Sequence, residues 1–141
     1  MSVEIKRAYE KPARADGARV LVDRLWPRGV GKEQASITEW LRALAPSDEL
    51  RKWFHAHGSM WAQFRSRYMH ELADPDALSD LNKLYDLVAK NKTVTLVYAS
   101  RDELHNNAVV LQDLINGARK PPSSSGPSKA AAMPKRARAR R

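Results

Sequence analysis

Two short segments hold the residue types that can do chemistry. The first begins at Asp23, and Arg24 and Arg28 stand on either side of Trp26. A carboxylate can act as a general base, guanidinium groups bind phosphate or carboxylate with two hydrogen bonds, and an indole offers a stacking face. Gly29 would allow a ligand to approach the backbone closely. The alternative is structural: Trp26 fills the core, the arginines are solvated, and Asp23 caps backbone amides.

The second segment leads from an apolar run into a helix. Its polar residues are Tyr98, Arg101, Asp102, His105, Asn106 and Asn107. Free amides and the helix dipole at such a position favour an anion, to which Arg101 adds a fixed charge. His105 can act as acid or base, with Asp102 holding its tautomer. Alternatively, Asp102 and the two asparagines only cap the helix.

These patterns give a set of candidate site residues. Asp23 and His105 are the candidate catalytic residues. The candidate ligand-binding residues are Arg24, Trp26, Arg28, Gly29, Tyr98, Arg101, Asp102, Asn106 and Asn107. No cluster of residues has metal-ligand spacing, and no dinucleotide or phosphate-loop fingerprint is present, so we predict neither a metal nor a cofactor.

Hydrophobic spacing predicts the elements that must position these residues. Strands are expected over 3–9, 19–23 and 93–99. Ser36 and Glu39 fit a capping box, which predicts a helix through Leu44. Four further helices are expected over 47–58, 61–72, 74–88 and 106–117.

The order of elements predicts an α/β fold. A long helical connection between the second and third strands favours parallel pairing, so we expect a small parallel-type sheet of about three strands packed with about five helices. Ligands of open parallel sheets bind beyond the carboxyl ends of the strands. The segments 23–31 and 100–107 both leave such ends and are therefore expected to lie side by side.

Charge divides the chain into two parts. The protein has 141 residues, with 25 Lys and Arg against 16 Asp and Glu. Eight of the basic residues and none of the acidic ones lie after residue 118, so the preceding part is nearly neutral. We predict a domain over 1–117 and a disordered, basic, Pro/Ser/Ala-rich tail over 118–141. Such a tail can neutralise phosphates of nucleic acid without reading sequence, or merely keep the protein in solution.

Composition excludes several classes of protein. The chain has no cysteine, which excludes disulfides, cysteine-ligated metal and thiol catalysis. With 43% hydrophobic residues it can form a packed core. No apolar run is long enough to cross a membrane and the N-terminus has no signal core, so a cytoplasmic protein without membrane partners is expected. The oligomeric state cannot be read from these features.

The two segments carry a resemblance to a known family. Residues 23–29, Asp-Arg-Leu-Trp-Pro-Arg-Gly, and residues 100–111, with Trp40, Trp53 and Trp61 between them, resemble the YeaO-like branch of domain-of-unknown-function family number 488. The resemblance covers about 1–117 and implies a compact α/β domain. In the broader family the loop before the last helix often carries Cys-His-Arg, where this chain has His105-Asn106-Asn107, so a thiol mechanism does not transfer to it.

Two functional hypotheses follow. The first is a pocket at the strand ends that binds a phosphate-bearing ligand, such as a nucleotide or a nucleic-acid end, with hydrolase or transferase chemistry as an option. Arg24, Arg28 and Arg101 would then hold the anion. The second is a non-enzymatic nucleic-acid-associated or protein-interaction domain in which the basic tail supplies polyanion affinity.

Overall fold

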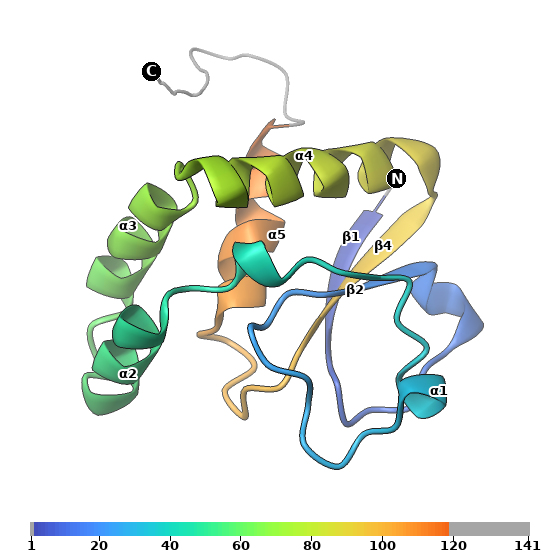
Figure 1. The fold of residues 1–141 in the computed structure, drawn as a ribbon, viewed down its shortest axis with the longest axis horizontal. Helices are drawn as coiled ribbons and strands as arrows, with labels where there is room; N and C mark the ends of the chain where they lie inside the picture. The colour runs from blue at the N-terminus through green and yellow to red at the C-terminus, as the bar shows by residue number, and fades with distance from the viewer. Residues whose placement is uncertain (1, 119–141) are drawn as a thin grey trace. The chain divides into compact units, whose positions relative to one another are not determined.

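The computed structural model describes residues 2–118 of the chain. A parallel four-stranded sheet forms its centre, with strand order β1-β4-β2-β3 (Figure 1). The strands are β1 (Ser2–Arg7), β2 (Ala18–Leu21), β3 (Glu39–Trp40) and β4 (Thr93–Tyr98). The helices are α1 (Lys32–Ala35), α2 (Asp48–Ala56), α3 (Trp61–Glu71), α4 (Pro75–Lys90) and α5 (Asn107–Ala118), with 3-10 turns η1 (Arg14–Asp16) and η2 (Arg42–Leu44). The expected α/β class is confirmed.

Strand β4 is the centre of the sheet. It pairs with β1 on one side, from Ser2 opposite Thr93 onward, and with β2 on the other, where Val20 lies opposite Leu96. Its residues 94–98 are all buried, as expected for a strand covered on both faces. The second and third predicted strands are therefore parallel neighbours, and the segments that follow them leave the same edge of the sheet.

The predicted helix over residues 36–44 is wrong. Ser36 ends α1 in a left-handed conformation (φ 50°) instead of starting a helix, and residues 39–40 form β3. The Thr38 amide donates to the Arg19 carbonyl (2.8 Å) and the Leu41 amide to the Leu21 carbonyl (3.0 Å). These bonds to a distant strand outweigh the local capping signal, so the sheet has four strands where about three were expected.

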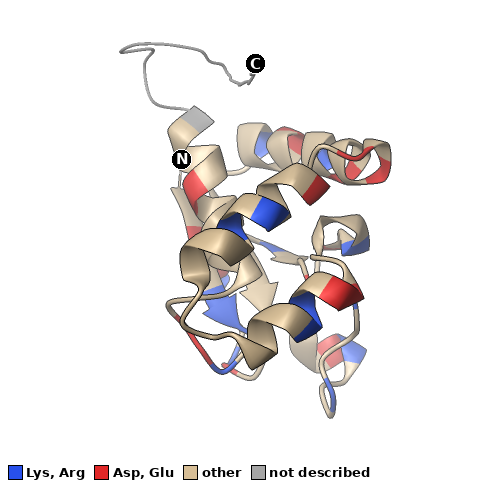
Figure 2. Cartoon of the chain, turned by 90° about the vertical axis from the view of Figure 1, so that its left-hand side faces the viewer, with Lys and Arg blue, Asp and Glu red and all other residues tan. Residues whose placement is uncertain are grey.

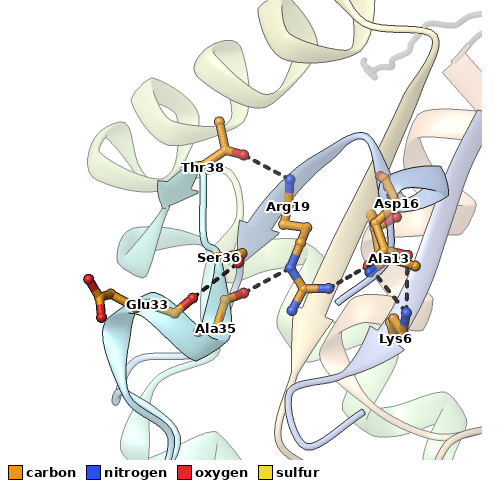
Figure 3. A network of polar contacts seen from close by, with 9 residues as sticks. Lys6, Ala13, Asp16, Arg19, Glu33, Ala35, Ser36 and Thr38 are labelled. Atoms are coloured by element: carbon orange, nitrogen blue, oxygen red, sulfur yellow. Dashed lines mark hydrogen bonds and ion pairs between the residues drawn. The ribbon is translucent and has the colours of Figure 1, made fainter. Parts of the chain in front are cut away.

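A buried arginine links β2 to the segment before β3 (Figure 3). The Arg19 side chain donates from Nε to the Ala35 carbonyl (2.9 Å) and from Nη1 to Asp16 Oδ2 (2.6 Å). Lys6 of β1 also donates to Asp16 (3.1 Å). Burial alone would raise the pKa of Asp16, but hydrogen bonds from the Ala13 amide, Lys6 and Arg19 hold it below its ordinary value. One carboxylate thus ties β1, η1 and β2 together.

The remaining helices begin where the sequence predicts. The Ser47 hydroxyl accepts from the Leu50 amide (3.1 Å) and caps α2. Pro75 stands in the first turn of α4, after Asp74. Leu81, Leu84 and Val88 form the buried stripe of α4.

The chain divides into two units, Met1–Val110 and Leu111–Arg141. The second unit begins inside α5, and the predicted disordered tail lies outside the described residues from residue 119 onward. The domain boundary predicted at residues 117 and 118 stays a prediction. Within residues 2–118, no helix is both long and apolar enough to span a bilayer.

Candidate functional site

The segments after β2 and β4 are hydrogen-bonded to each other. Asp23 Oδ2 accepts from the Ala99 amide (2.8 Å), and Asp23 Oδ1 accepts from Asn107 Nδ2 (3.1 Å). Asn107 Nδ2 also donates to the Val22 carbonyl (2.9 Å). The prediction that the two segments lie side by side is confirmed, and Asp23 is the residue that joins them.

These bonds change what Asp23 can do. Burial raises the pKa of the Asp23 carboxyl above its ordinary value, although the bonds from Ala99 and Asn107 act in the opposite direction. Both carboxylate oxygens accept hydrogen bonds, so the main structural role of Asp23 is to hold the start of α5 against the end of β2. Its catalytic role stays a prediction.

The other residues of the first segment point in different directions. Trp26 donates from Nε1 to the Val30 carbonyl (2.6 Å) and packs edge-on against Trp40, with ring centres 5.5 Å apart. Arg28 is exposed in a turn closed by a bond from the Val30 amide to the Pro27 carbonyl (3.3 Å). Gly29 has φ 80°, and a Cβ added there would meet no atom within 4 Å. A glycine is therefore favoured at this position by the backbone conformation of the turn and not by close packing.

Most polar side chains of the second segment form hydrogen bonds within that segment and the first turn of α5. Asp102 Oδ1 accepts from the Leu104 and His105 amides (2.9 and 3.0 Å), and Asp102 Oδ2 lies 3.3 Å from His105 Nδ1. Burial would raise the pKa of Asp102, but these bonds lower it. Asn106 Oδ1 accepts from the Val109 amide (3.1 Å) and caps α5.

The other three candidate residues of this segment lie in different surroundings. Tyr98 is buried, with 1% of its surface exposed, and burial raises its pKa. The His105 ring stands edge-on to Trp61 at the start of α3, with centres 5.1 Å apart. Arg101 is exposed. His105 therefore lies against α3 while Trp26 lies against β3, and the structure does not gather them around one cavity.

An arginine lies at or just after the carboxyl end of every strand of the sheet. In sheet order these are Arg7, the last residue of β1; Arg101, after β4; Arg24, after β2; and Arg42, after β3. We call these four residues the arginine row. Neighbouring strands are about 4.8 Å apart, so the row spans roughly 15 Å of the sheet edge. Arg24, Arg42 and Arg101 are exposed, and Arg7 donates to the Ser100 carbonyl (2.9 Å).

One end of the arginine row borders a concavity. An open hollow of about 400 Å³ is lined by Arg24, Trp40, Arg42, Ala43, Asp76, Ser79 and Asp80. We call it the hollow. It receives residues from the segment after β2, from β3, from η2 and from the first turns of α4.

Sequence reasoning missed most of these residues. The strand pattern indicates only a structural place for Arg7, and the capping signal predicts an α-helix at Arg42, which lies instead in the 3-10 turn η2. Once β3 is known, the signal is visible, because β1 ends with an arginine and each of the other three strands is followed by one within three residues. Asp76 carries no signal of its own, since acidic residues in a first helical turn are common, and Ser79 stands in no recognisable motif. Within residues 2–118, no group of three His, Asp or Glu side chains is arranged to hold a metal.

Comparisons with known proteins agree on the family. YeaO of Escherichia coli K12, an uncharacterised protein, is 41% identical over 113 residues, which cover 80% of this chain and 96% of YeaO. The uncharacterised protein Rv3073c of Mycobacterium tuberculosis H37Rv is 42% identical over 115 residues, 82% of this chain and 94% of that protein. No solved structure matches the chain significantly.

The family model that matches covers all of the described residues and part of the segment predicted as a basic tail. It is described as "Inactive DUF488-N3 subclade" and matches residues 2–132. The expected resemblance to the YeaO-like branch is thereby confirmed, and the chain belongs to the inactive DUF488-N3 subclade of the family with domain of unknown function 488.

Proposed function

We propose that this protein binds a phosphate-bearing ligand, a nucleotide or a nucleic-acid end, along the carboxyl edge of its sheet and does not transform it. The observation that carries the proposal is the arginine row, together with Arg28, which is exposed on the segment after β2. Guanidinium groups are the side chains best suited to phosphate oxygens, because they stay charged and donate two parallel hydrogen bonds. The carboxyl edge is also where open parallel sheets hold their ligands.

The state of the acidic groups supports binding of an anion at this edge. Asp23 directs its oxygens to the Ala99 amide and to Asn107 Nδ2, so they face donors of the protein. Asp102 directs its oxygens to two amides and to His105. Arg28 and Arg101 remain exposed on the two joined segments.

Three observations favour binding without catalysis. The family description contains the word "inactive", and the chain has no cysteine to act as a nucleophile. The candidate general base, Asp23, has both oxygens occupied by the bonds that hold the fold. A group so engaged is poorly placed to accept a proton from a substrate.

The proposal predicts that the exposed arginines control affinity for phosphate. We expect AMP and inorganic phosphate to bind the full chain saturably, as measured by chemical shift changes of backbone amides. Arg28→Ala and Arg101→Ala should each weaken AMP binding about tenfold, since a charge-assisted bond contributes roughly 1.5–3 kcal/mol. The melting temperature should stay unchanged, because neither side chain packs in the core.

Arg14→Ala is the matched control for this experiment. Arg14 is equally exposed but lies in η1, before the start of β2, at the opposite edge of the sheet. Its variant should bind AMP like the parent protein. Equal affinity in all four proteins, or the lack of saturable binding, would refute the proposal.

Nucleic-acid binding through the tail is the second candidate function. The specific observation is the segregation of charge: eight basic and no acidic residues lie after residue 118. Such a segment binds polyanions through its charge alone and carries no sequence readout.

A further inference from the structure

The hollow has walls of opposite charge. Arg24 and Arg42 form one wall, at the β2–β3 end of the arginine row. The lining residues from the first turns of α4 are Asp76, Ser79 and Asp80, and we call them the anionic wall. This wall distinguishes the hollow from the rest of the sheet edge, because a phosphate group that approaches the two arginines here also meets two carboxylates.

Arg24 and Arg42, the cationic wall, are held in place by contacts that leave some of their N–H groups free to bind a ligand. The Arg42 guanidinium lies 3.9 Å from the centre of the Trp40 ring, and the Trp40 indole donates to the Asp23 carbonyl (2.8 Å). Arg24 reaches the Pro46 carbonyl through one nitrogen at 3.4 Å. Each guanidinium has five N–H groups, so both retain donors for a ligand after these contacts.

The anionic wall has one engaged and one free carboxylate. Asp80 Oδ2 accepts from the Ala43 amide (3.0 Å), and its Oδ1 lies 3.7 Å from Lys83 Nζ. The side chains of Asp76 and Ser79 make no hydrogen bond or ion pair with other residues in the described range 2–118. Asp76 therefore brings to the lining of the hollow a negative charge that has no direct ion-pair partner within residues 2–118.

We propose that the hollow binds a small zwitterion of the amino-acid class, with its carboxylate between Arg24 and Arg42 and its ammonium group against Asp76. A lone anion is repelled by the carboxylates and a lone cation by the guanidinium groups, whereas a dipolar ligand satisfies both walls at once. A volume of about 400 Å³ lies within the usual range for small-molecule sites. This site shares Arg24 and Arg42 with the arginine row, but only the zwitterion proposal uses Asp76, so substitutions of Asp76 test it separately from the phosphate proposal.

A series of ω-amino acids tests the proposal and measures the distance between the walls. The full chain is titrated with glycine, β-alanine, 4-aminobutyrate and 5-aminopentanoate, and amide and indole N–H shifts are recorded. We expect one chain length to bind best and to shift the Trp40 indole and the amides of residues 42–43 and 76–80. Acetate and methylammonium, which carry one charge each, should bind at least tenfold more weakly.

Two substitutions of Asp76 separate a role in binding from a role in folding. Asp76→Asn should weaken the best amino acid about tenfold, while Asp86→Asn, an exposed change later on the same helix, should not. Asp76→Glu keeps the charge but moves it forward by one methylene, so the preferred ligand should become one methylene shorter.

Three results would overturn the proposal. They are the lack of a saturable shift with every amino acid, acetate binding as tight as the amino acids and insensitive to Asp76→Asn, and an unchanged length preference in Asp76→Glu. Failure of AMP binding in Arg28→Ala or Arg101→Ala bears only on the phosphate proposal, because neither arginine lines the hollow.

Discussion

Single charged residues in this protein hold the fold at points where hydrophobic contacts alone would not define it. Arg19 is 3% exposed and has one buried nitrogen, Nη2, without a hydrogen-bond partner among the described residues. Its charge is balanced by Asp16, which also binds Lys6. A buried ion pair adds little net stability compared with a hydrophobic pair, but removing one partner leaves a charge without compensation.

Asp16→Ala should therefore lower the free energy of unfolding much more than the removal of one small side chain would suggest. We expect a loss of about 3–5 kcal/mol in the free energy of unfolding, measured with urea, because Arg19 remains buried without its counter-charge. The double change of Asp16→Ala with Arg19→Met should recover part of this loss. Asp48→Ala removes an exposed ion-paired carboxylate and should have a much smaller effect. Similar effects of both single changes would contradict this role for Asp16.

The raised pKa of Asp23 predicts that its contribution to the free energy of unfolding changes with pH in the direction opposite to that of most aspartates. Burial raises its folded pKa above the unfolded value of 3.8, so the folded state binds this proton more tightly. The resulting stabilisation is complete below pH 3.8 and is lost as pH rises through the folded pKa. The difference in free energy of unfolding between the parent and Asp23→Asn should thus fall over that window. A constant or rising difference would show that the Asp23 pKa is not raised.

Secondary-structure elements differ in how far local sequence determines them. The α2 cap, the start of α4 at Pro75 and the apolar run of β4 were all predicted, because each depends on neighbours in the chain. β3 was missed, because its two residues are strand only through bonds to Arg19 and Leu21. Arg24 and Arg101 were predicted as binding residues, but the place of Arg42 in the arginine row and the hollow were missed for the same reason. The contact between Asp23 and the Ser100–Asn107 segment was foreseen, since parallel topology alone requires it.

The α2 cap gives a test at this scale. Ser47 accepts from the Leu50 amide and also donates from Oγ to Glu71 Oε2 at 2.6 Å, which connects α2 to the end of α3. Ser47→Ala should cost about 1–2 kcal/mol in urea unfolding. In a double-mutant cycle with Glu71→Gln, the two changes should be non-additive, because they share one bond. Strict additivity would mean that the contact between the helices contributes nothing.

For the whole molecule, charge is distributed very unevenly along the sequence. Residues 1–118 are nearly neutral although the chain carries +9. In the view of Figure 2, the helices α2 and α3 carry both basic and acidic segments, so this face is not a continuous basic surface. Any strong affinity for polyanions is therefore expected to come from residues 119–141.

Deleting residues 119–141 tests that expectation. Binding of a labelled DNA duplex, followed by fluorescence anisotropy at several salt concentrations, should weaken and lose most of its salt dependence, because up to eight phosphate contacts are removed. A full-length variant with the eight basic residues changed to glutamine should behave like the deletion. Retention of affinity and salt dependence by either variant would place nucleic-acid binding in the domain.

The position of β4 also determines when the protein can fold during synthesis. β1 pairs only with β4 among the described strands, and its Ser2 lies opposite Thr93. A nascent chain that ends before Thr93 can form no strand pairing except the two-residue contact of β2 with β3. On the ribosome, β1 therefore stays unpaired until β4 has left the exit tunnel. During this time the emerging chain exposes an unpaired strand edge, which chaperones are expected to shield.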